Sequence, residues 1–235
     1  MRDKIRIFHY NKTSILIEFD SEINEKLLEF ILNFKNKLLE NGDEQILQVI
    51  NTYNSLLIIY KSTINNFYNE KERLLVVISD LNVTKKLDMQ LKKIPVCYDK
   101  DFGLDLELLS DNLQLSISEI ISRHTEPIYR VFFIGFLPGF PYLEGLDSSL
   151  YYRRKSQPRP QISIGSVGIA DKQTGIYPLD SPGGWQIIGR SPIELFNSNQ
   201  QNDLCYLKPG DKVQFEPISK EEFEYIQYQS NEKSN

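Results

Sequence analysis

Residues 161–190, QISIGSVGIADKQTGIYPLDSPGGWQIIGR, consist of short β-prone stretches separated by glycine and proline turns. Strands are predicted at residues 161–164, 167–169 and 185–188 and, outside this stretch, at residues 131–136 and 212–215. Many short strands joined by tight turns are typical of a β-barrel, because closing the sheet removes its exposed edges. The pattern therefore predicts a closed or nearly closed barrel for this half of the chain.

The composition changes near residue 94. All 11 prolines lie at or after Pro95, and 11 of the 12 glycines lie after Gly42. Earlier residues form long runs of Ile, Leu, Asn, Lys and Glu with little such punctuation. We therefore expect an α+β protein of two unlike domains, residues 1–93 and residues 94–235, the second being the barrel with a polar C-terminal tail.

The first domain is predicted to have the order β-β-α-β-β-α, with helices on one face of a small antiparallel sheet. A hairpin turning at Asn11-Lys12 precedes an amphipathic helix whose apolar stripe runs from Leu27 to Leu38 and which ends at Asn41-Gly42. Strands are expected at residues 5–8, 15–19, 45–52 and 56–60, and the second helix, which could break near residues 74–78, at residues 64–81. The polar residues show no convergent cluster, which favours an interaction domain without chemistry.

The second domain is predicted to begin with a strand at residues 94–98 followed by two short helices. The second helix starts with a capping box, Ser116-Ile117-Ser118-Glu119. His124 then lies at the C-terminal end of this helix, where the helix dipole favours a protonated imidazole. We expect His124 either to titrate near neutral pH, as a proton-transfer group, or to be a surface histidine without a role.

Charge and composition exclude several classes of protein. The chain has 27 Lys and Arg against 32 Asp and Glu, a net charge of −5, so nucleic acid and anionic membranes are not expected partners. The start, MRDKIRIFHYNKTS, has no apolar run after its charges, which argues against a secretory signal. No apolar run of about 18 residues occurs, which argues against a membrane span, and a cytoplasmic location is expected. Cys97 and Cys205 are expected in buried packing rather than in a redox motif.

Several common catalytic motifs are missing from the sequence. It contains no P-loop, no G-x-G-x-x-G after a strand and no G-x-S-x-G nucleophile elbow. Two histidines and two distant cysteines cannot supply an ordinary zinc site, so no metal ligands are predicted. Metal-free chemistry or pure binding remains.

Four loops rich in glycine and proline lie between residues 136 and 185, with aromatic side chains and arginines among them. Glycine lets a ligand approach the main chain, and proline holds a loop rigid. Because an arginine fork pairs with carboxylate or phosphate, the loops predict a pocket for a small anionic molecule. The alternatives are that the loops only turn corners of the barrel and that the arginines tie them to acidic neighbours such as Asp171 or Asp180.

The site residues predicted from these loops fall into three groups. The candidate catalytic residues are His124, Arg159 and Arg190, and the further cations are Arg153 and Arg154. The candidate substrate-binding residues are Phe136, Pro138, Gly139, Phe140, Tyr142, Gly165, Ser166, Gly168, Gln173, Thr174, Tyr177, Gly183, Gly184 and Trp185. The aromatic residues of the outer loops are also expected to contact a partner protein, although Trp185 could equally be core.

Three segments make the sequence recognisable: GFLPGFPYLEGLD at residues 135–147, QPRPQISIGSVGIADKQTGIYPLDSPGGWQIIGRSPIELF at residues 157–196 and LKPGDKVQFEPI at residues 207–218. They resemble the B-subunit family of bacterial ATP-dependent 5-oxoprolinase, also called the KipI or allophanate hydrolase subunit 1 family. The resemblance covers essentially the whole chain and implies a ferredoxin-like N-terminal domain and a cyclophilin-like β-barrel domain. This chain departs from the family at Ala170-Asp171, where Gly-Gly is usual, and at Ile164, where Ala is usual.

The resemblance implies three functions of different classes. In the favoured one, the chain helps to open 5-oxoproline to glutamate together with a KipA-type protein and a LamB/YcsF-type protein, with ATP bound with or by these partners. The second is half of a biotin-dependent carboxyltransferase of the kind found within urea amidolyases. The third is a KipI-like inhibitor of a sensor histidine kinase. Because no self-contained catalytic set is evident, the chain alone is expected to be inactive.

Overall fold

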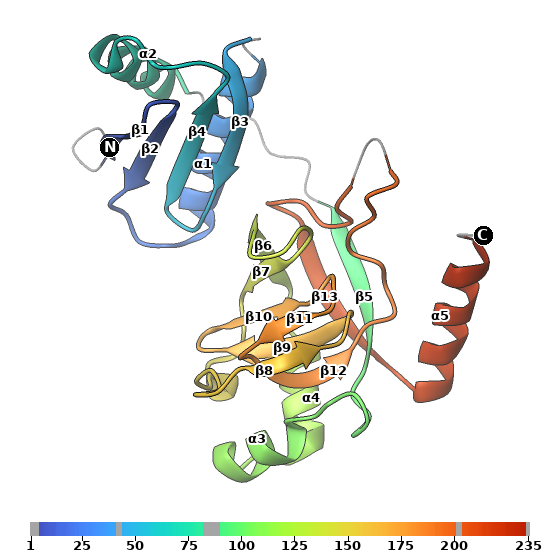
Figure 1. Ribbon diagram of the computed structural model, residues 1–235. Helices are drawn as coiled ribbons and strands as arrows, with labels where there is room; N and C mark the ends of the chain where they lie inside the picture. The colour runs from blue at the N-terminus through green and yellow to red at the C-terminus, as the bar shows by residue number, and fades with distance from the viewer. Residues whose placement is uncertain (1–4, 41–43, 82–89, 201–203, 234–235) are drawn as a thin grey trace. The chain divides into compact units, whose positions relative to one another are not determined.

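The computed structural model describes residues 5–40, 44–81, 90–200 and 204–233 (Figure 1). The chain forms two compact units, Met1–Asp88 and Met89–Asn235. Strand β5 (Leu91–Cys97) belongs to the second unit, so the barrel begins at Leu91 rather than at Ile94, where the composition changes. Lys92 and Lys93 lie in this strand, and their charges hide it from a search for apolar runs.

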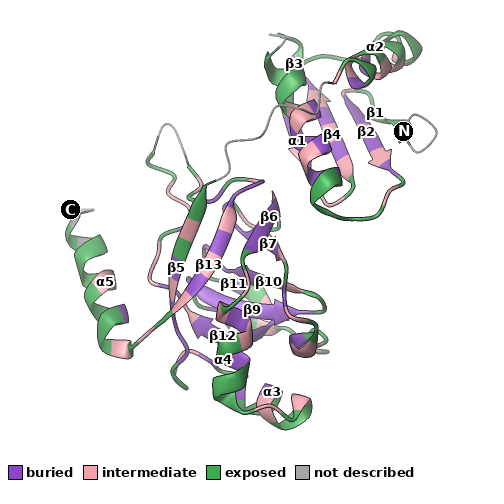
Figure 2. Ribbon diagram, turned by 180° about the vertical axis from the view of Figure 1, so that it is seen from behind, coloured by how far each residue is buried: buried purple, intermediate pink, exposed green. Residues whose placement is uncertain are grey.

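The first unit is a four-stranded antiparallel sheet with the strand order β1-β2-β4-β3. Its elements are β1 (Ile5–Asn11), β2 (Ser14–Phe19), α1 (Glu25–Glu40), β3 (Ile46–Asn51), β4 (Ser55–Tyr60) and α2 (Phe67–Ser79). Alternate residues of the two central strands, including Ile15 and Ile17 in β2 and Leu56 and Ile58 in β4, are completely buried against the apolar stripe of α1 (Figure 2). The predicted order of elements is confirmed.

Helix α2 is shorter than predicted and does not break. It begins after Asn66, whose side chain accepts a hydrogen bond from the Asn69 N–H at 3.1 Å. Leu74 and Ile78 are buried four residues apart while Val76 is exposed, which is the spacing of a helix face. The predicted end of the first helix at Asn41-Gly42 lies outside the described residues.

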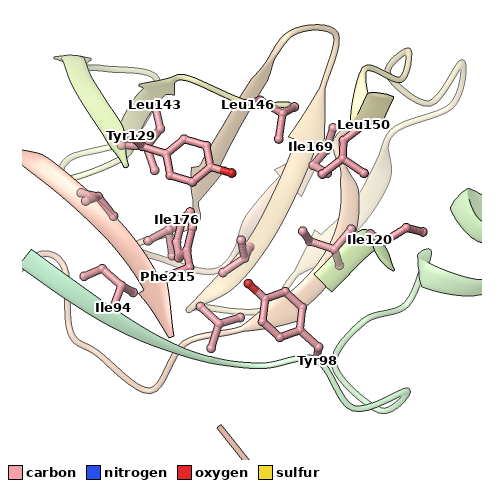
Figure 3. Close-up of a cluster of buried hydrophobic side chains, with 14 of the residues drawn as sticks. Ile94, Tyr98, Ile120, Tyr129, Leu143, Leu146, Leu150, Ile169, Ile176 and Phe215 are labelled. Atoms are coloured by element: carbon pink, nitrogen blue, oxygen red, sulfur yellow. The ribbon is translucent and has the colours of Figure 1, made fainter. Parts of the chain in front are cut away.

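The second unit contains a closed seven-stranded barrel in the order β10-β7-β6-β13-β5-β12-β9, which confirms the predicted barrel. Its strands besides β5 are β6 (Tyr129–Ile134), β7 (Pro141–Glu144), β9 (Ser166–Ala170), β10 (Gln173–Ile176), β12 (Gln186–Arg190) and β13 (Lys212–Ile218). Strands β8 (Arg159–Ile162) and β11 (Ser181–Gly183) form a separate two-stranded sheet. Inward-facing side chains such as Ile94, Tyr129, Ile169 and Phe215 fill the barrel (Figure 3).

Helices α3 (Leu106–Leu113) and α4 (Ile117–Thr125) lie at one end of the barrel (Figure 1). The predicted capping box is present, since Ser116 accepts from the Glu119 N–H and Glu119 accepts from the Ser116 N–H. Ile120 of α4 is completely buried in the barrel core. Among the helices that the structure describes, none is long and apolar enough to cross a membrane.

Four further segments differ from the sequence prediction in the type of element. Strands β7, β10 and β11 were predicted as loops, and the predicted polar tail contains helix α5 (Lys220–Lys233). The three strands have only three or four residues each, too few for apolar alternation to be visible. Gly175 in β10 is needed for packing, because a Cβ there would lie 2.8 Å from the Pro141 carbonyl oxygen.

Candidate functional site

Four predicted pocket residues form one aromatic cluster, defined here as Phe140, Tyr142, Tyr177 and Trp185. The ring centroid of Phe140 lies 5.1 Å from that of Tyr142 and 5.2 Å from those of Tyr177 and Trp185, all in edge-to-face arrangements. Phe140 and Tyr177 are 1% exposed and Trp185 is 6% exposed. The structure thus brings these residues together, but as a small core against the barrel wall, with only Tyr142 half-buried at its rim.

An ion cluster, defined here as Asp105, Lys155 and Arg159, lies in the same unit. Arg159 donates two parallel hydrogen bonds to Asp105, at 2.8 and 2.7 Å, and Lys155 Nζ lies 2.8 Å from Asp105 Oδ1. The backbone N–H of Ile187 in β12 also donates to Asp105, at 2.7 Å. Burial raises the pKa of Asp105, but these hydrogen bonds outweigh that effect and hold its pKa below the usual value.

The two clusters are linked by the backbone and by charge. The Lys155 N–H donates to the Gly184 carbonyl at 2.7 Å, so the Lys155 backbone pairs with the residue that precedes Trp185. The Arg154 guanidinium lies 5.8 Å from the Trp185 ring centroid and pairs with Asp171 at 3.3 Å. Burial raises the pKa of Tyr177 to about 12, with Arg154 and Arg159 acting in the opposite direction.

Arg190 has different partners from Arg159. Its Nε donates to the Ile164 carbonyl at 2.8 Å, and its guanidinium lies 5.8 and 5.7 Å from the rings of Phe102 and Phe223. It borders an open groove of about 520 Å³ whose lining also includes Ser191, Glu194, Asn197 and Gln227. In the structural alternative, Arg159 and Arg190 would pair with acidic neighbours such as Asp171 or Asp180. Arg159 does pair with an acidic residue, Asp105, whereas Asp171 contacts Arg154 and Asp180 accepts from the Ile164 N–H.

His124 lies in the barrel core, which corrects the expectation that it titrates near neutral pH or sits on the surface. It is 0% exposed, and burial lowers its pKa to about 3. Its Nδ1 lies 2.7 Å from the Tyr98 hydroxyl and its Nε2 lies 2.9 Å from the Thr174 hydroxyl, which donates to the Gly168 carbonyl. Thr174 therefore accepts from His124, so Nε2 carries the proton and Nδ1 accepts from Tyr98. This neutral imidazole joins α4 to the barrel.

The predicted glycines mostly serve the packing of the protein itself. Gly165 has φ +83°, and a Cβ there would lie 2.2 Å from the Ser191 carbonyl oxygen. A Cβ on Gly183 would lie 2.4 Å from the Tyr177 hydroxyl. At Gly184, by contrast, the nearest atoms are 3.6 Å or more away. Gly184 therefore has room for a Cβ at ordinary contact distances, and packing does not require a glycine there.

The other predicted site residues are divided between the surface and the interior. Phe136 is 63% exposed with φ +68°, and Pro138 is also exposed. Gly139, Ser166, Gly168 and Thr174 are buried, and Gln173 and Arg159 are partly buried. Among the described residues, no group of three or more His, Cys, Asp or Glu side chains could hold a metal ion. Cys97 is buried and Cys205 partly buried, both as free thiols.

Sequence reasoning missed Asp105 and Lys155. An acidic residue just before an apolar helix is typical of a helix cap, yet the Asp105 side chain makes no capping hydrogen bond and turns to the cations instead. Lys155 follows Arg153 and Arg154, and nothing in that basic run distinguishes it. Only the tertiary contacts identify both residues.

Comparison with known proteins agrees with this architecture. Residues 5–207 match the family model described as "Carboxyltransferase domain, subdomain C and D". The B subunit of the Bacillus subtilis 5-oxoprolinase is 35% identical, over 98% of this chain and 100% of its own length. The chain belongs to the 5-oxoprolinase B-subunit family. A Haemophilus influenzae protein of the same name is 39% identical over 74% of this chain and 80% of its own length.

Solved structures of this family's fold extend the comparison. TTHA0988 is 31% identical with a TM-score of 0.75 over 88% of this chain, which spans only 40% of the TTHA0988 chain. The Kluyveromyces lactis urea amidolyase has a TM-score of 0.77 at 20% identity, a likeness of fold covering 96% of this chain and 15% of that one. Because the curated relatives are named as B subunits, their names imply that they act in complexes with other proteins.

Proposed function

We propose that this chain is the B subunit of an ATP-dependent 5-oxoprolinase, which opens 5-oxoproline to glutamate. The observation that carries the proposal is the 35% identity to the B subunit of the Bacillus subtilis 5-oxoprolinase over the whole of that protein. The partners are a KipA-type protein and a LamB/YcsF-type protein, and the location is cytoplasmic. In this proposal the first unit is ferredoxin-like, because its order β-β-α-β-β-α is a β-α-β-β-α-β order with the last strand moved to the front. The barrel is cyclophilin-like.

The reaction requires activation of an unreactive amide. Phosphoryl transfer from ATP to the lactam carbonyl oxygen would release ADP and make the carbonyl carbon electrophilic. One water would then add to this carbon and expel the ring nitrogen as the amine, and a second water would hydrolyse the resulting acyl phosphate to the carboxylate and inorganic phosphate. Such a step depends mainly on positioning and on stabilising negative charge. The sequence has no P-loop, so ATP is assigned to a site formed with or by the partner proteins.

In this proposal the chain contributes a cationic, partly apolar surface rather than a complete catalytic set. Arg154, Arg159 and Arg190 supply positive charge, and Tyr142, Gly183 and Gly184 line the accessible rim of the aromatic cluster. Phe136 and Pro138 contribute an exposed loop. His124 supports the barrel and does not take part in proton transfer, because it is completely buried.

Reconstitution tests the proposal. The purified chain should release no glutamate from 5-oxoproline with ATP, whereas adding the KipA-type and LamB/YcsF-type proteins from the same organism should give ATP-dependent glutamate release. The matched control is the partner mixture without this chain, which should be inactive. Glutamate release by the chain alone, or an assembled three-component complex that releases none, would contradict the proposal.

A second candidate is half of a biotin-dependent carboxyltransferase. The matching family model is itself described as a carboxyltransferase domain, which favours this alternative over a kinase inhibitor. The two candidates differ in substrate. A complex that consumes carboxybiotin but releases no glutamate from 5-oxoproline would favour the carboxyltransferase.

A further inference from the structure

The carboxylate of Asp105 has no remaining capacity for hydrogen bonds. Oδ1 accepts from Lys155 Nζ at 2.8 Å and from Arg159 Nη2 at 2.7 Å. Oδ2 accepts from Arg159 Nη1 at 2.8 Å and from the Ile187 N–H at 2.7 Å. A carboxylate offers about four acceptor positions, so all of them are filled. The Asp105 side chain is also only 3% exposed, which keeps solvent from it.

The two cations, in contrast, keep both charge and donors. Lys155 has three N–H donors and Arg159 has five, and Asp105 takes only a minority of them. In the part of the chain that the structure describes, Lys155 and Arg159 form no ion pair with any other carboxylate. Two positive charges thus share one negative charge, which leaves the ion cluster with a net charge of about +1.

The free side of the ion cluster faces a surface that a small molecule can reach. Lys155 and Arg159 side chains are 20% and 25% exposed, whereas the carboxylate behind them is buried. The Lys155 N–H donates to the carbonyl of Gly184, a partly exposed loop residue where a Cβ would make only ordinary contacts. The buried aromatic cluster beside it lowers the local dielectric, which strengthens the attraction of an anion to a positive group.

We infer that Lys155 and the outer N–H groups of Arg159 bind a small oxyanion, a carboxylate or a phosphoryl group, and that Asp105 is the positioning residue that holds both cations. The assignment of this oxyanion to a substrate rests on the proposed function. The paired Nη donors of Arg159, which were expected to bind the anion, donate to Asp105, so Lys155 makes the main contact with the anion. A compact ammonium with two unspent donors suits a phosphoryl or carboxylate oxygen.

The competing explanation is purely structural. Asp105 immediately precedes α3 and contacts β8 through Arg159 and β12 through the Ile187 N–H, so the ion cluster could serve only to hold these elements together. Water would then satisfy the remaining donors. The two explanations differ in what happens when Lys155 alone is changed, because Arg159 and Ile187 still hold Asp105 in place.

The test is a binding measurement on the isolated chain of 235 residues. Inorganic phosphate and acetate are titrated at constant ionic strength, with calorimetry and thermal shift as readouts. We expect saturable binding of at least one probe, and Lys155→Gln should weaken it about 10- to 100-fold, the effect of losing a charged hydrogen-bond donor. Lys155→Arg should retain much of the binding. Response to acetate, phosphate or both identifies the oxyanion as a carboxylate, a phosphoryl group or either.

Lys172→Gln is the matched control, since it removes the same charge from an exposed lysine that lies over the Tyr151 ring. It should leave binding unchanged. The inference is overturned if neither probe binds or if Lys155→Gln binds as tightly as the unmodified chain. It is also overturned if Lys155→Gln and Lys172→Gln weaken binding equally. The measurement uses neither ATP nor partner proteins, so its failure is distinguishable from failure of the reconstituted reaction.

Discussion

Asp105→Asn should strongly destabilise the second unit. The variant keeps the size of the side chain but replaces one carboxylate oxygen by an NH2 group, which then faces the donors of Lys155 and Arg159. Breaking a buried ion pair by removing one partner costs about 3–5 kcal/mol, because the remaining charge is left uncompensated. At about 2–4 °C per kcal/mol for a domain of this size, the melting temperature should fall by about 6–20 °C.

Trp185 fluorescence during urea unfolding measures this loss. Trp185 is the only tryptophan of the chain, so its signal reports unfolding of the second unit alone. Asp101→Asn is the matched control: Asp101 pairs with Lys220 at 2.6 Å but is exposed. Exposed pairs contribute about 0.2–1 kcal/mol, so this variant should behave almost as the unmodified chain.

A decrease of less than about 1 kcal/mol in the free energy of unfolding of Asp105→Asn would refute the reasoning. Neutralising a buried carboxylate with four hydrogen-bond donors should destabilise the fold by more than that. A comparable loss in Asp101→Asn would also refute it, since burial would then not be the deciding variable. A large loss in Asp105→Asn alone supports the account of the ion cluster. It would also explain why Lys155, rather than Asp105, is the residue to change in binding experiments.

Three further predictions concern His124, Phe136 and Trp185. The pKa of His124 is about 3 in the folded protein and about 6.5 in an unfolded chain. As the pH drops, the unfolded state therefore takes up the proton first. The free energy of unfolding should fall between about pH 6.5 and 4.5, by up to about 1.4 kcal/mol per pH unit. His124 is the only histidine of the second unit, so His124→Asn should reduce this pH dependence. The measurement is urea unfolding at each pH, monitored by Trp185 fluorescence. An unchanged pH dependence would contradict the lowered pKa of His124. Phe136→Ala should weaken binding of the KipA-type partner by about 1 kcal/mol or more in calorimetry while leaving the melting temperature unchanged, because Phe136 is 63% exposed. Unchanged partner affinity in Phe136→Ala would show that the loop containing Phe136 is not part of the interface. Trp185→Ala should instead destabilise the fold by about 3–5 kcal/mol, as expected for a tryptophan that is 6% exposed.

Local patterns in the sequence predicted much of the architecture. The alternation of Ile15 and Ile17 and the apolar stripe from Leu27 to Leu38 led to the order of the first unit, because strand and helix periods are properties of neighbouring residues. The capping box at Ser116 was predicted for the same reason. Glycine and proline turns predicted a barrel, although strands as short as β7 and β10 carry too few residues to show a period.

The departure at Asp171 shows how far a single position can be understood from sequence. The family resemblance implies Gly at this position, and Asp171 has φ +55° in the turn between β9 and β10. Asp is among the residues that tolerate this left-handed conformation, so the turn is kept. Its contact with Arg154, however, joins residues from different segments and could not be read from either one.

The amino-acid sequence specifies which side chains are available to the site, whereas the role of each side chain depends on its contacts in the folded chain. Arg159 and Arg190 are the same residue type, but Arg159 is paired with a buried carboxylate and Arg190 lies against two aromatic rings. His124 lies in the last turn of α4, where the helix dipole favours a protonated imidazole. Burial in the barrel nevertheless keeps the imidazole neutral, because desolvation outweighs the dipole. Asp105 meets Arg159 across 54 residues of chain, and such long-range electrostatic contacts depend on the folded backbone that brings them together.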